Sequence, residues 1–380
     1  MSEYSDGHAY LKALKERNHR ETQNFSDFTR YLGQKAREKG IPLNGQIELT
    51  PLCNFQCVMC YVHLSGEQMT QPLIAPSRWN DLITQAVAEG MLSLTLSGGE
   101  CLTYPGFREV YEHAQHLGCE VEIFTNGSLL DDEWIGYFRR HPPAGIHITL
   151  YGDSEDAYER VTGQRAFART LEHIRRINDA SLPLRINVTP NAALGEDVFG
   201  TIRLAMELSR NVMVNHLLTD PRTETGRSGK ISDLDDDFYI RILKFQNELK
   251  GFRLETCPAE KLPAEGGPDT DGIRYGVLCG GGRSGFNMDW KGVMHPCNEL
   301  ESISAYPFET GFREAWDQIK QEVSRWRRAA ACEGCAYEAV CESCVGRVAS
   351  FAEPGIWPHA LCERTKHFVQ QGVYPAPECP

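Results

Sequence analysis

The stretch QIELTPLCNFQCVMCY at residues 46–61 joins a short strand-like run to three closely spaced cysteines. Its first five residues alternate polar and apolar side chains, which is typical of a β-strand. Cys53, Cys57 and Cys60 follow almost at once. In a sheet of parallel strands, functional sites form in the loops beyond the carboxyl ends of the strands. The cysteines therefore lie where such a fold would place its chemistry.

Strand-like and amphipathic helical runs alternate from residue 45 to about residue 217. Six strands are predicted, at residues 46–50, 92–96, 121–125, 146–150, 184–188 and 212–218. Helices are predicted between them, at residues 76–90, 107–118, 132–140, 167–179 and 196–210. This order indicates right-handed βαβ crossovers, and hence a parallel sheet of the α/β class.

The flanking sequence suggests how the rest of the chain is organised. A helix is predicted at residues 233–251, and the segment at 257–272 is rich in proline and glycine, as linkers are. Beyond it the chain is dense in cysteine and short of long regular elements, so we expect metal to replace part of the missing core. Four segments result: an N-terminal helical segment at 1–44, the sheet domain at 45–232, a bridging helix and linker at 233–272, and a cysteine-rich domain at 273–380.

The composition is that of a globular protein, with 41% apolar and 24% charged residues among 380. No run of apolar residues is long enough to span a membrane, and the N-terminus has no secretory signal. The net charge of −13 argues against an extended phosphate-binding surface. Fourteen cysteines without an export signal favour metal or redox chemistry over disulfides. We therefore expect a cytoplasmic protein that binds neither nucleic acid nor membrane.

The three clustered thiols allow two kinds of metal site. Thiolates at relative positions 1, 5 and 8 can bind three corners of a [4Fe–4S] cubane and leave its fourth iron for an outside ligand. Alternatively, His63 completes a structural zinc site. The next strand favours the cluster, because it ends in LSGGECLTYPGF at residues 96–107. There two glycines let a ligand approach the backbone, and Glu100 offers a carboxylate to a cation.

The pattern CxxxCxxC after one strand, with GGE after the next, resembles the radical SAM superfamily. The resemblance implies a partial (β/α)6 barrel whose cluster, on Cys53, Cys57 and Cys60, binds S-adenosylmethionine (SAM) through its amino and carboxylate groups. Cys101 stands where the family usually has proline. The resemblance also implies SAM contacts by Tyr61 at the adenine, by Gly98, Gly99 and Glu100 at the ammonium group, by Asn126 after the third strand, and by Thr149 and Arg160 near the carboxylate.

A second group of cysteines lies toward the C-terminus. Taken alone, the CxxC–x5–CxxC pattern at residues 332–344 fits a four-cysteine zinc site. The whole set resembles the SPASM extension of radical SAM enzymes, which holds two auxiliary [4Fe–4S] clusters. That resemblance implies a distal cluster on Cys332, Cys335, Cys341 and Cys362, and a proximal cluster on Cys279, Cys297 and Cys344. The proximal cluster either uses Cys257 as fourth ligand or has an open iron; we favour the open iron, so that Cys257→Ala should leave the iron content unchanged.

The resemblance implies that SAM is cleaved to a 5′-deoxyadenosyl radical, which removes hydrogen from a substrate. Residues 279–298 look most like maturases of ribosomally made peptides. We therefore expect a thioether, a carbon–carbon crosslink or an epimerised residue in a precursor peptide, with flavodoxin or ferredoxin as electron donor. Asn298 replaces the catalytic aspartate of sulfatase-maturing enzymes, which disfavours that branch. The alternatives are a small-molecule radical SAM dehydrogenase and, outside enzymes, a zinc-stabilised scaffold protein.

Overall fold

The structure is a computed structural model, and it describes residues 28–62, 72–215, 234–251, 279–326, 335–337, 340–341 and 359–374. His63, the linker at 257–272 with Cys257, and the predicted ligands Cys332 and Cys344 lie outside the described residues. No helix in the described part of the chain is both long enough and apolar enough to cross a membrane.

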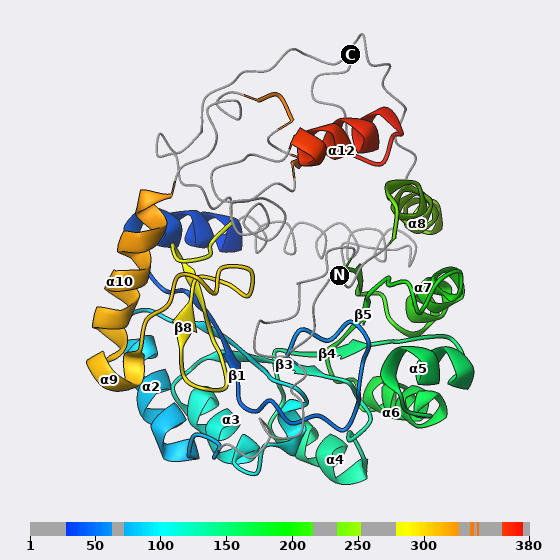
Figure 1. Cartoon of the computed structure of the whole chain (residues 1–380). Helices are drawn as coiled ribbons and strands as arrows, with labels where there is room; N and C mark the ends of the chain where they lie inside the picture. The colour runs from blue at the N-terminus through cyan, green and yellow to red at the C-terminus, as the bar shows by residue number, and fades with distance from the viewer. Residues whose placement is uncertain are drawn as a thin grey trace, which may run out of the picture.

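The described residues form one eight-stranded sheet with the strand order β6-β5-β4-β3-β2-β1-β7-β8 (Figure 1). Its first six strands are β1 (Asn44–Glu48), β2 (Ser93–Ser97), β3 (Glu120–Thr125), β4 (Gly145–Thr149), β5 (Leu184–Val188) and β6 (Val212–Val214). Every pairing among these six is parallel. The predicted parallel sheet is therefore confirmed, and each of the six strands begins within two residues of its predicted start.

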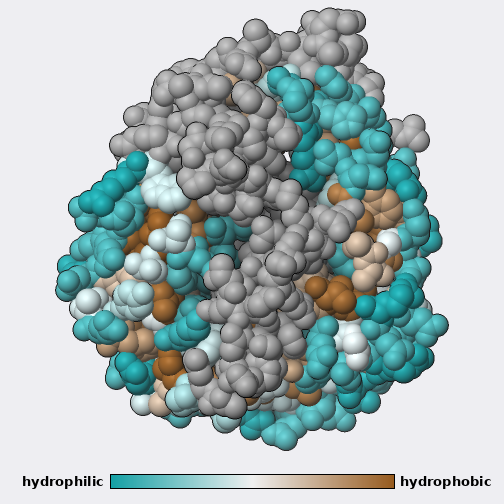
Figure 2. Space-filling view, in the orientation of Figure 1, coloured by the Kyte–Doolittle hydropathy of each residue, from teal (hydrophilic) through white to brown (hydrophobic). Residues whose placement is uncertain are grey.

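The helices between these strands form an arc outside the curved sheet (Figure 1). They are α2 (Pro76–Ala88), α3 (Phe107–His116), α4 (Asp132–Arg140), α5 (Glu155–Thr162), α6 (Phe167–Asp179) and α7 (Asp197–Leu208), with a short 3₁₀ helix η2 (Cys101–Thr103) after β2. In α2, the buried residues Trp79, Leu82, Ile83 and Ala86 recur at helical spacing on one face. The outward surfaces of the helices in Figure 2 are predominantly hydrophilic, as amphipathic helices require. All of these α-helices except α5 were predicted.

Two strands from the C-terminal part of the chain extend the sheet. The strand β7 (Gly285–Met288) pairs in parallel with β1, and β8 (Met294–His295) pairs antiparallel with β7. Phe286 lies against Phe312 and Trp316, and all three belong to the same hydrophobic core as β1 and β2. Residues from both sides of position 273 therefore share one hydrophobic core in the described part of the chain.

The region that was expected to be short of long regular elements contains two helices of ordinary length. After the short α9 (Pro307–Thr310) comes α10 (Phe312–Arg325), with 14 residues, and α12 (His359–Gln370) has 12. The buried residues of α10 recur three or four positions apart, which is the helical period. The predicted bridging helix is confirmed as α8 (Asp236–Leu249), and it packs on Phe368 of α12 through Tyr239, Ile240 and Leu243.

Candidate active site

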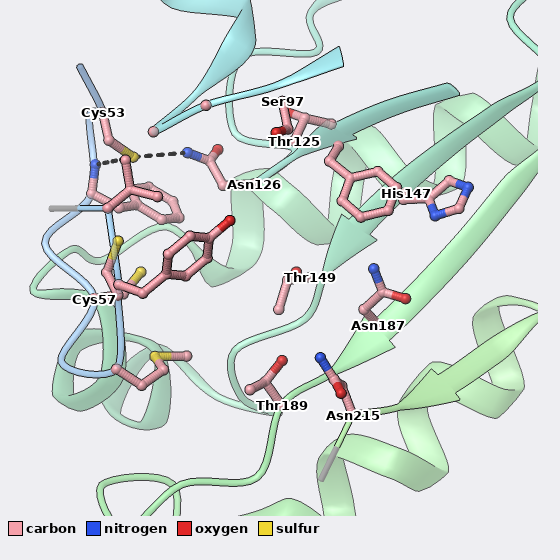
Figure 3. Close-up of a pocket in the computed structure, with 18 of the residues that line it drawn as sticks. Cys53, Cys57, Ser97, Thr125, Asn126, His147, Thr149, Asn187, Thr189 and Asn215 are labelled. Atoms are coloured by element: carbon pink, nitrogen blue, oxygen red, sulfur yellow. Dashed lines mark hydrogen bonds between the residues drawn. The ribbon is translucent and has the colours of Figure 1, made fainter. Parts of the chain in front are cut away.

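A cavity of about 350 Å³ opens at the carboxyl ends of the strands, and the cysteine-rich loop after β1 forms one of its walls (Figure 3). Eight of the ten residues predicted to bind the first cluster or SAM line this cavity. They are Cys53, Cys57, Cys60, Tyr61, Gly98, Gly99, Asn126 and Thr149. The topology explains the convergence, since β1, β2, β3 and β4 are adjacent and parallel and their loops leave the sheet at the same edge.

Backbone hydrogen bonds hold the cysteine loop on the end of helix α5. The N–H groups of Gln56 and Val58 donate to the carbonyls of Thr162 and Val161 over 2.8 and 2.9 Å. Phe55, which precedes Gln56, is buried with 1% of its surface exposed and lies edge-on against Tyr151. The loop therefore has a fixed shape before any metal binds, with its thiols on the cavity side.

In this loop Cys57 is buried, Cys53 and Cys60 are half-buried, and none of the three forms a disulfide. Burial raises the pKa of Cys53 to about 12 and also raises the pKa of Cys57. A thiol in such an environment stays protonated unless a nearby positive charge stabilises the thiolate, which is the form that binds metals. Bound iron would supply that charge.

The arrangement of ligands fits a cluster better than a single ion. In the described part of the chain, no three histidine, cysteine or carboxylate side chains are placed to bind one metal ion together. The cysteines of a [4Fe–4S] cluster bind separate irons, so their sulfurs need not converge on one point. Three thiols on one cavity wall therefore suit three corners of a cubane, although His63 of the zinc alternative is not described.

Gly98 and Gly99 are required by the packing of the protein backbone. A Cβ atom on Gly99 would lie 2.5 Å from the carbonyl oxygen of Leu52 and 2.6 Å from that of Pro51. Gly98 has a φ of +150°, and a Cβ atom there would collide with the carbonyl oxygen of Thr50. The N–H of Gly99 also donates to Thr50 over 2.7 Å. This glycine pair thus lets the loop after β2 lie directly against the segment that leads into Cys53, while both residues still face the cavity.

Glu100 lies behind the cavity wall and is not among the residues that line it. Its carboxylate is fully buried and accepts hydrogen bonds from the backbone N–H of Asn126 (2.7 Å), the hydroxyl of Thr125 (2.8 Å) and the backbone N–H of Leu102 (3.1 Å). Burial raises the pKa of Glu100, and these hydrogen bonds oppose the shift. The carboxylate therefore joins the loops after β2 and β3, and the structure does not bring it to the predicted SAM position.

We expect Glu100→Gln to destabilise the protein by about 2 kcal/mol, because the glutamine NH2 group would face a backbone N–H with no acceptor left for it. Thermal unfolding of the variant checks this, with Glu314→Gln on the exposed face of α10 as the matched control. If Glu100→Gln unfolds at the same temperature as Glu314→Gln, the carboxylate does not have this role.

Arg160 also lies away from the cavity. Its guanidinium pairs with the carboxylate of Asp197, and its Nε donates to the carbonyl oxygen of Ala193 over 3.4 Å. Both charged side chains are about half exposed, so the pair contributes little to stability. The structure thus places Arg160 at the surface junction of α5 and α7.

We expect Arg160→Gln to leave the KM for SAM within about twofold of the unchanged protein, because only a screened surface pair is lost. Steady-state kinetics of SAM cleavage provide the measurement. An increase of an order of magnitude in KM would return Arg160 to the SAM site.

Hydrogen bonds connect the first cysteine loop to the C-terminal part of the chain. The hydroxyl of Tyr61 donates to the buried carboxylate of Glu48 over 3.2 Å and accepts from the amide nitrogen of Asn298, also over 3.2 Å. Asn298 lines the cavity, and its side-chain oxygen is buried without a partner among the described residues. The residue that follows Cys60 therefore contacts the residue that follows Cys297.

Asn126 connects the loop after β3 to the cysteine loop (Figure 3). Its amide nitrogen donates to the side chain of Asn54 over 2.8 Å and lies 3.9 Å from the sulfur of Cys53. The backbone N–H of Phe55 also points at that sulfur, over 3.4 Å. Two N–H donors are therefore directed at Cys53, and such donors influence the potential of a cluster.

Several polar residues of the cavity wall were not predicted from the sequence, including Tyr151, His147 and Asn187. A signal for two of them was present. In β4 and β5 polar residues alternate with isoleucine and valine, and this period of two places them together on one face of the sheet. No local pattern marked Tyr151, which belongs to the loop after β4.

The second cysteine group is only partly described. Cys279 is exposed, while Cys297, Cys335, Cys341 and Cys362 are half-buried, and none of these five forms a disulfide. The backbone N–H of Gly281 donates to the sulfur of Cys279 over 3.3 Å. The two predicted ligand sets remain predictions, because each includes a cysteine outside the described residues.

Comparisons with a family model and with known proteins support this interpretation of the site. Residues 47–197 match the family model of the radical SAM superfamily. AdoMet-dependent heme synthase of Methanosarcina barkeri is 27% identical over 321 residues, which cover 79% of this chain and 90% of that protein. A probable GTP 3′,8-cyclase of Saccharolobus solfataricus is 34% identical over 186 residues, or 47% of this chain and only 56% of the relative.

Two further relatives concern peptides. PqqA peptide cyclase of Bradyrhizobium diazoefficiens is 25% identical over 285 residues, covering 72% of this chain and 71% of that protein. SuiB of Streptococcus suis, solved with S-adenosylmethionine, shares the fold with a TM-score of 0.66 at 17% identity, over 85% of this chain and 78% of SuiB. With the cysteine loop and the parallel sheet, these matches identify residues 47–197 as a radical SAM domain, in a chain that resembles the peptide maturases of that superfamily.

Proposed function

We propose that this radical SAM enzyme modifies a ribosomally made peptide, by forming a thioether or carbon–carbon crosslink or by epimerising a residue. The observation that carries the proposal is the cavity in which Cys53, Cys57 and Cys60 face the inner surface of a parallel sheet. PqqA peptide cyclase supports a peptide substrate, and SuiB has been solved with its precursor peptide SuiA.

The residues of the cavity have distinct roles in this proposal. When bound, the cluster and SAM supply an electron and a 5′-deoxyadenosyl radical that removes hydrogen from the substrate. The three thiols of the first loop hold three irons. Gly98, Gly99 and Thr149 lie where they can contact SAM, and Tyr61 is held at its position by Glu48 and Asn298. Asn126 and the N–H of Phe55 direct hydrogen bonds at Cys53 and so adjust the reduction potential.

The second cysteine group would hold two auxiliary clusters of a SPASM domain. We assign Cys332, Cys335, Cys341 and Cys362 to the distal cluster and Cys279, Cys297 and Cys344 to the proximal one, with flavodoxin or ferredoxin as electron donor. Support comes from their spacing and from the contact between Asn298 and Tyr61, which places Cys297 beside the cavity wall. Iron and sulfide analysis after anaerobic reconstitution should give roughly twelve irons per chain.

A small-molecule substrate is the second candidate. It is favoured by the match to AdoMet-dependent heme synthase, which spans 90% of that relative. A sulfatase-type maturase is less favoured, because the side chain at residue 298 is a neutral amide that cannot act as a general base.

Anaerobic incubation tests the peptide proposal. The reconstituted enzyme is mixed with SAM, dithionite and a short peptide encoded beside its own gene, and the peptide is analysed by mass spectrometry. Crosslinking removes two hydrogens from the peptide, whereas epimerisation in deuterated water replaces one carbon-bound hydrogen by deuterium. If 5′-deoxyadenosine forms while every such peptide is unchanged, the small-molecule candidate replaces the peptide proposal.

A further inference from the structure

We propose that the part of the cavity remote from the cysteines binds a carboxylate group of the substrate, with Arg185 as its main contact and an apolar skeleton beside it. This inference rests on the proposed function and specifies the chemical class of its substrate. Cysteines, glycines and Tyr61 form the other part of the same cavity.

The strand register defines this remote part. Phe124 of β3 pairs with His147 of β4, which in turn pairs with Arg185 of β5, so the three side chains lie side by side on the inner face. In Figure 3, His147 and Asn187 lie across the cavity from Cys53 and Cys57. Arg185 precedes Thr189 by four residues. Measured along the strand, it therefore lies about 13 Å farther from the cysteine loop than Thr189 does. A ligand that reaches both ends must therefore extend well beyond the SAM site.

Charge is the first argument for an anion. Although the chain has a net charge of −13, no aspartate, glutamate or lysine is among the described residues that line the cavity. Arg185 is the one permanently charged residue among them. Its Nε donates to the side chain of Asn211 over 3.2 Å, and its terminal nitrogens make no hydrogen bond or ion pair with another described residue. Those two nitrogens can donate two parallel hydrogen bonds to a single carboxylate.

The neighbouring polar atoms also lack partners. His147 is buried, with 3% of its surface exposed, and its Nε2 lies 3.4 Å from the carboxylate of Glu122. The Nδ1 of His147 and the side-chain oxygen of Asn187 are both buried without a hydrogen-bond partner in the described structure. Leaving buried polar atoms unpaired is unfavourable, so a bound polar group is expected to pair with them.

Glu122 limits the charge of the ligand. Hydrogen bonding to His147 lowers the pKa of Glu122, and the nearby Arg185 acts in the same direction, so this carboxylate stays ionised. It offsets part of the positive charge of Arg185. The positive charge that is not offset suits a ligand group with one negative charge, such as a carboxylate. It suits a phosphate ester less well, because that group carries nearly two negative charges.

Two apolar side chains flank these polar groups. Phe124 is 37% exposed and Met213 is 48% exposed, and both line the cavity from strands on either side of β4 and β5. Large apolar side chains left open inside a pocket favour an apolar ligand. Methionine sulfur also packs well against aromatic rings. The combination fits an aliphatic or aromatic carboxylate.

The test uses the reconstituted, SAM-bound enzyme and two pairs of probes. One pair is 3-phenylpropanoate and its neutral amide; the other is a capped peptide containing phenylalanine and glutamate, and the same peptide with glutamine. Ligand-observed NMR gives the affinities. In at least one pair we expect the acid to bind about tenfold more tightly than the amide, because a charge-assisted hydrogen bond is lost in the amide. The pair that shows the preference identifies the source of the carboxylate.

Variants of Arg185 then test whether this residue causes the preference for the acid over the amide. Arg185→Gln should abolish it, Arg185→Lys should keep part of it, and the surface control Arg139→Gln should keep all of it. Equal binding of acid and amide in both pairs, or an undiminished preference in Arg185→Gln, would overturn the assignment. Failure of the unchanged enzyme to form 5′-deoxyadenosine would instead overturn the proposed function, so the two failures are distinguishable.

Discussion

Replacing Cys53, Cys57 and Cys60 together by alanine is expected to reduce 5′-deoxyadenosine formation by about a thousandfold or more. These thiols are the proposed protein ligands of the cluster. Water cannot take the place of thiolate ligands on its irons. The iron content should fall by about four per chain, the complement of one cubane. Any auxiliary clusters should stay, because none of their assigned ligands is changed.

The fold is expected to survive this triple substitution. Phe55 and the backbone hydrogen bonds of Gln56 and Val58 to α5 anchor the loop without the thiols. Cys119→Ala is the matched control, because Cys119 is buried in the core at the start of β3 and does not line the cavity. The control should keep its iron and its rate. A triple variant that keeps both would show that the cluster is bound elsewhere.

Gly99→Ala is expected to destabilise the protein by about 3 kcal/mol, the upper end of the usual effect of overpacking. The added methyl group would lie 2.5 Å from the carbonyl of Leu52 and 2.6 Å from that of Pro51. Backbone atoms cannot move aside as a flexible side chain can. The segment leading into Cys53 must therefore shift, so the variant should also lose iron from the first cluster.

The same substitution at Gly136 provides a matched control. Gly136 lies inside helix α4, and the nearest atom to an added Cβ is the Nη1 of Arg140 at 3.6 Å. Alanine should stabilise that helix by about 1 kcal/mol. Thermal unfolding and iron analysis of both variants measure the contrast. Equal stability of the Gly99→Ala and Gly136→Ala variants would mean that Gly98 and Gly99 do not pack against the backbone as tightly as the structure indicates.

Local sequence patterns were enough to predict the parallel sheet, because each strand and helix carries its own period. Helix α5 was missed although its signals were present. Ser154 caps it by accepting from the N–H of Ala157 over 3.2 Å, and Gly163 ends it with a φ of +69°. With only eight residues, its apolar pattern was too short to recognise beside the SAM motif.

Long-range contacts were beyond prediction from one sequence. Strand β7 is four residues long, and its partner β1 lies some 240 positions earlier, with Asn44 opposite Gly285. The bond between Asn298 and Tyr61 spans 237 positions. The cysteine loop could be recognised because its three cysteines lie within eight residues. The remote part of the cavity could not, because Arg185, His147 and Phe124 meet only once three strands are paired.

In the proposed function, three cysteines leave one iron of the first cluster for SAM. Electron–nuclear double resonance on the reduced, reconstituted enzyme tests it directly, using SAM labelled with ¹⁵N in its amino group and ¹³C in its carboxylate. We predict hyperfine coupling of both labels to the cluster, and loss of both couplings in the triple alanine variant. Absence of coupling in the SAM-saturated enzyme with its full complement of iron would show that SAM does not bind the open iron.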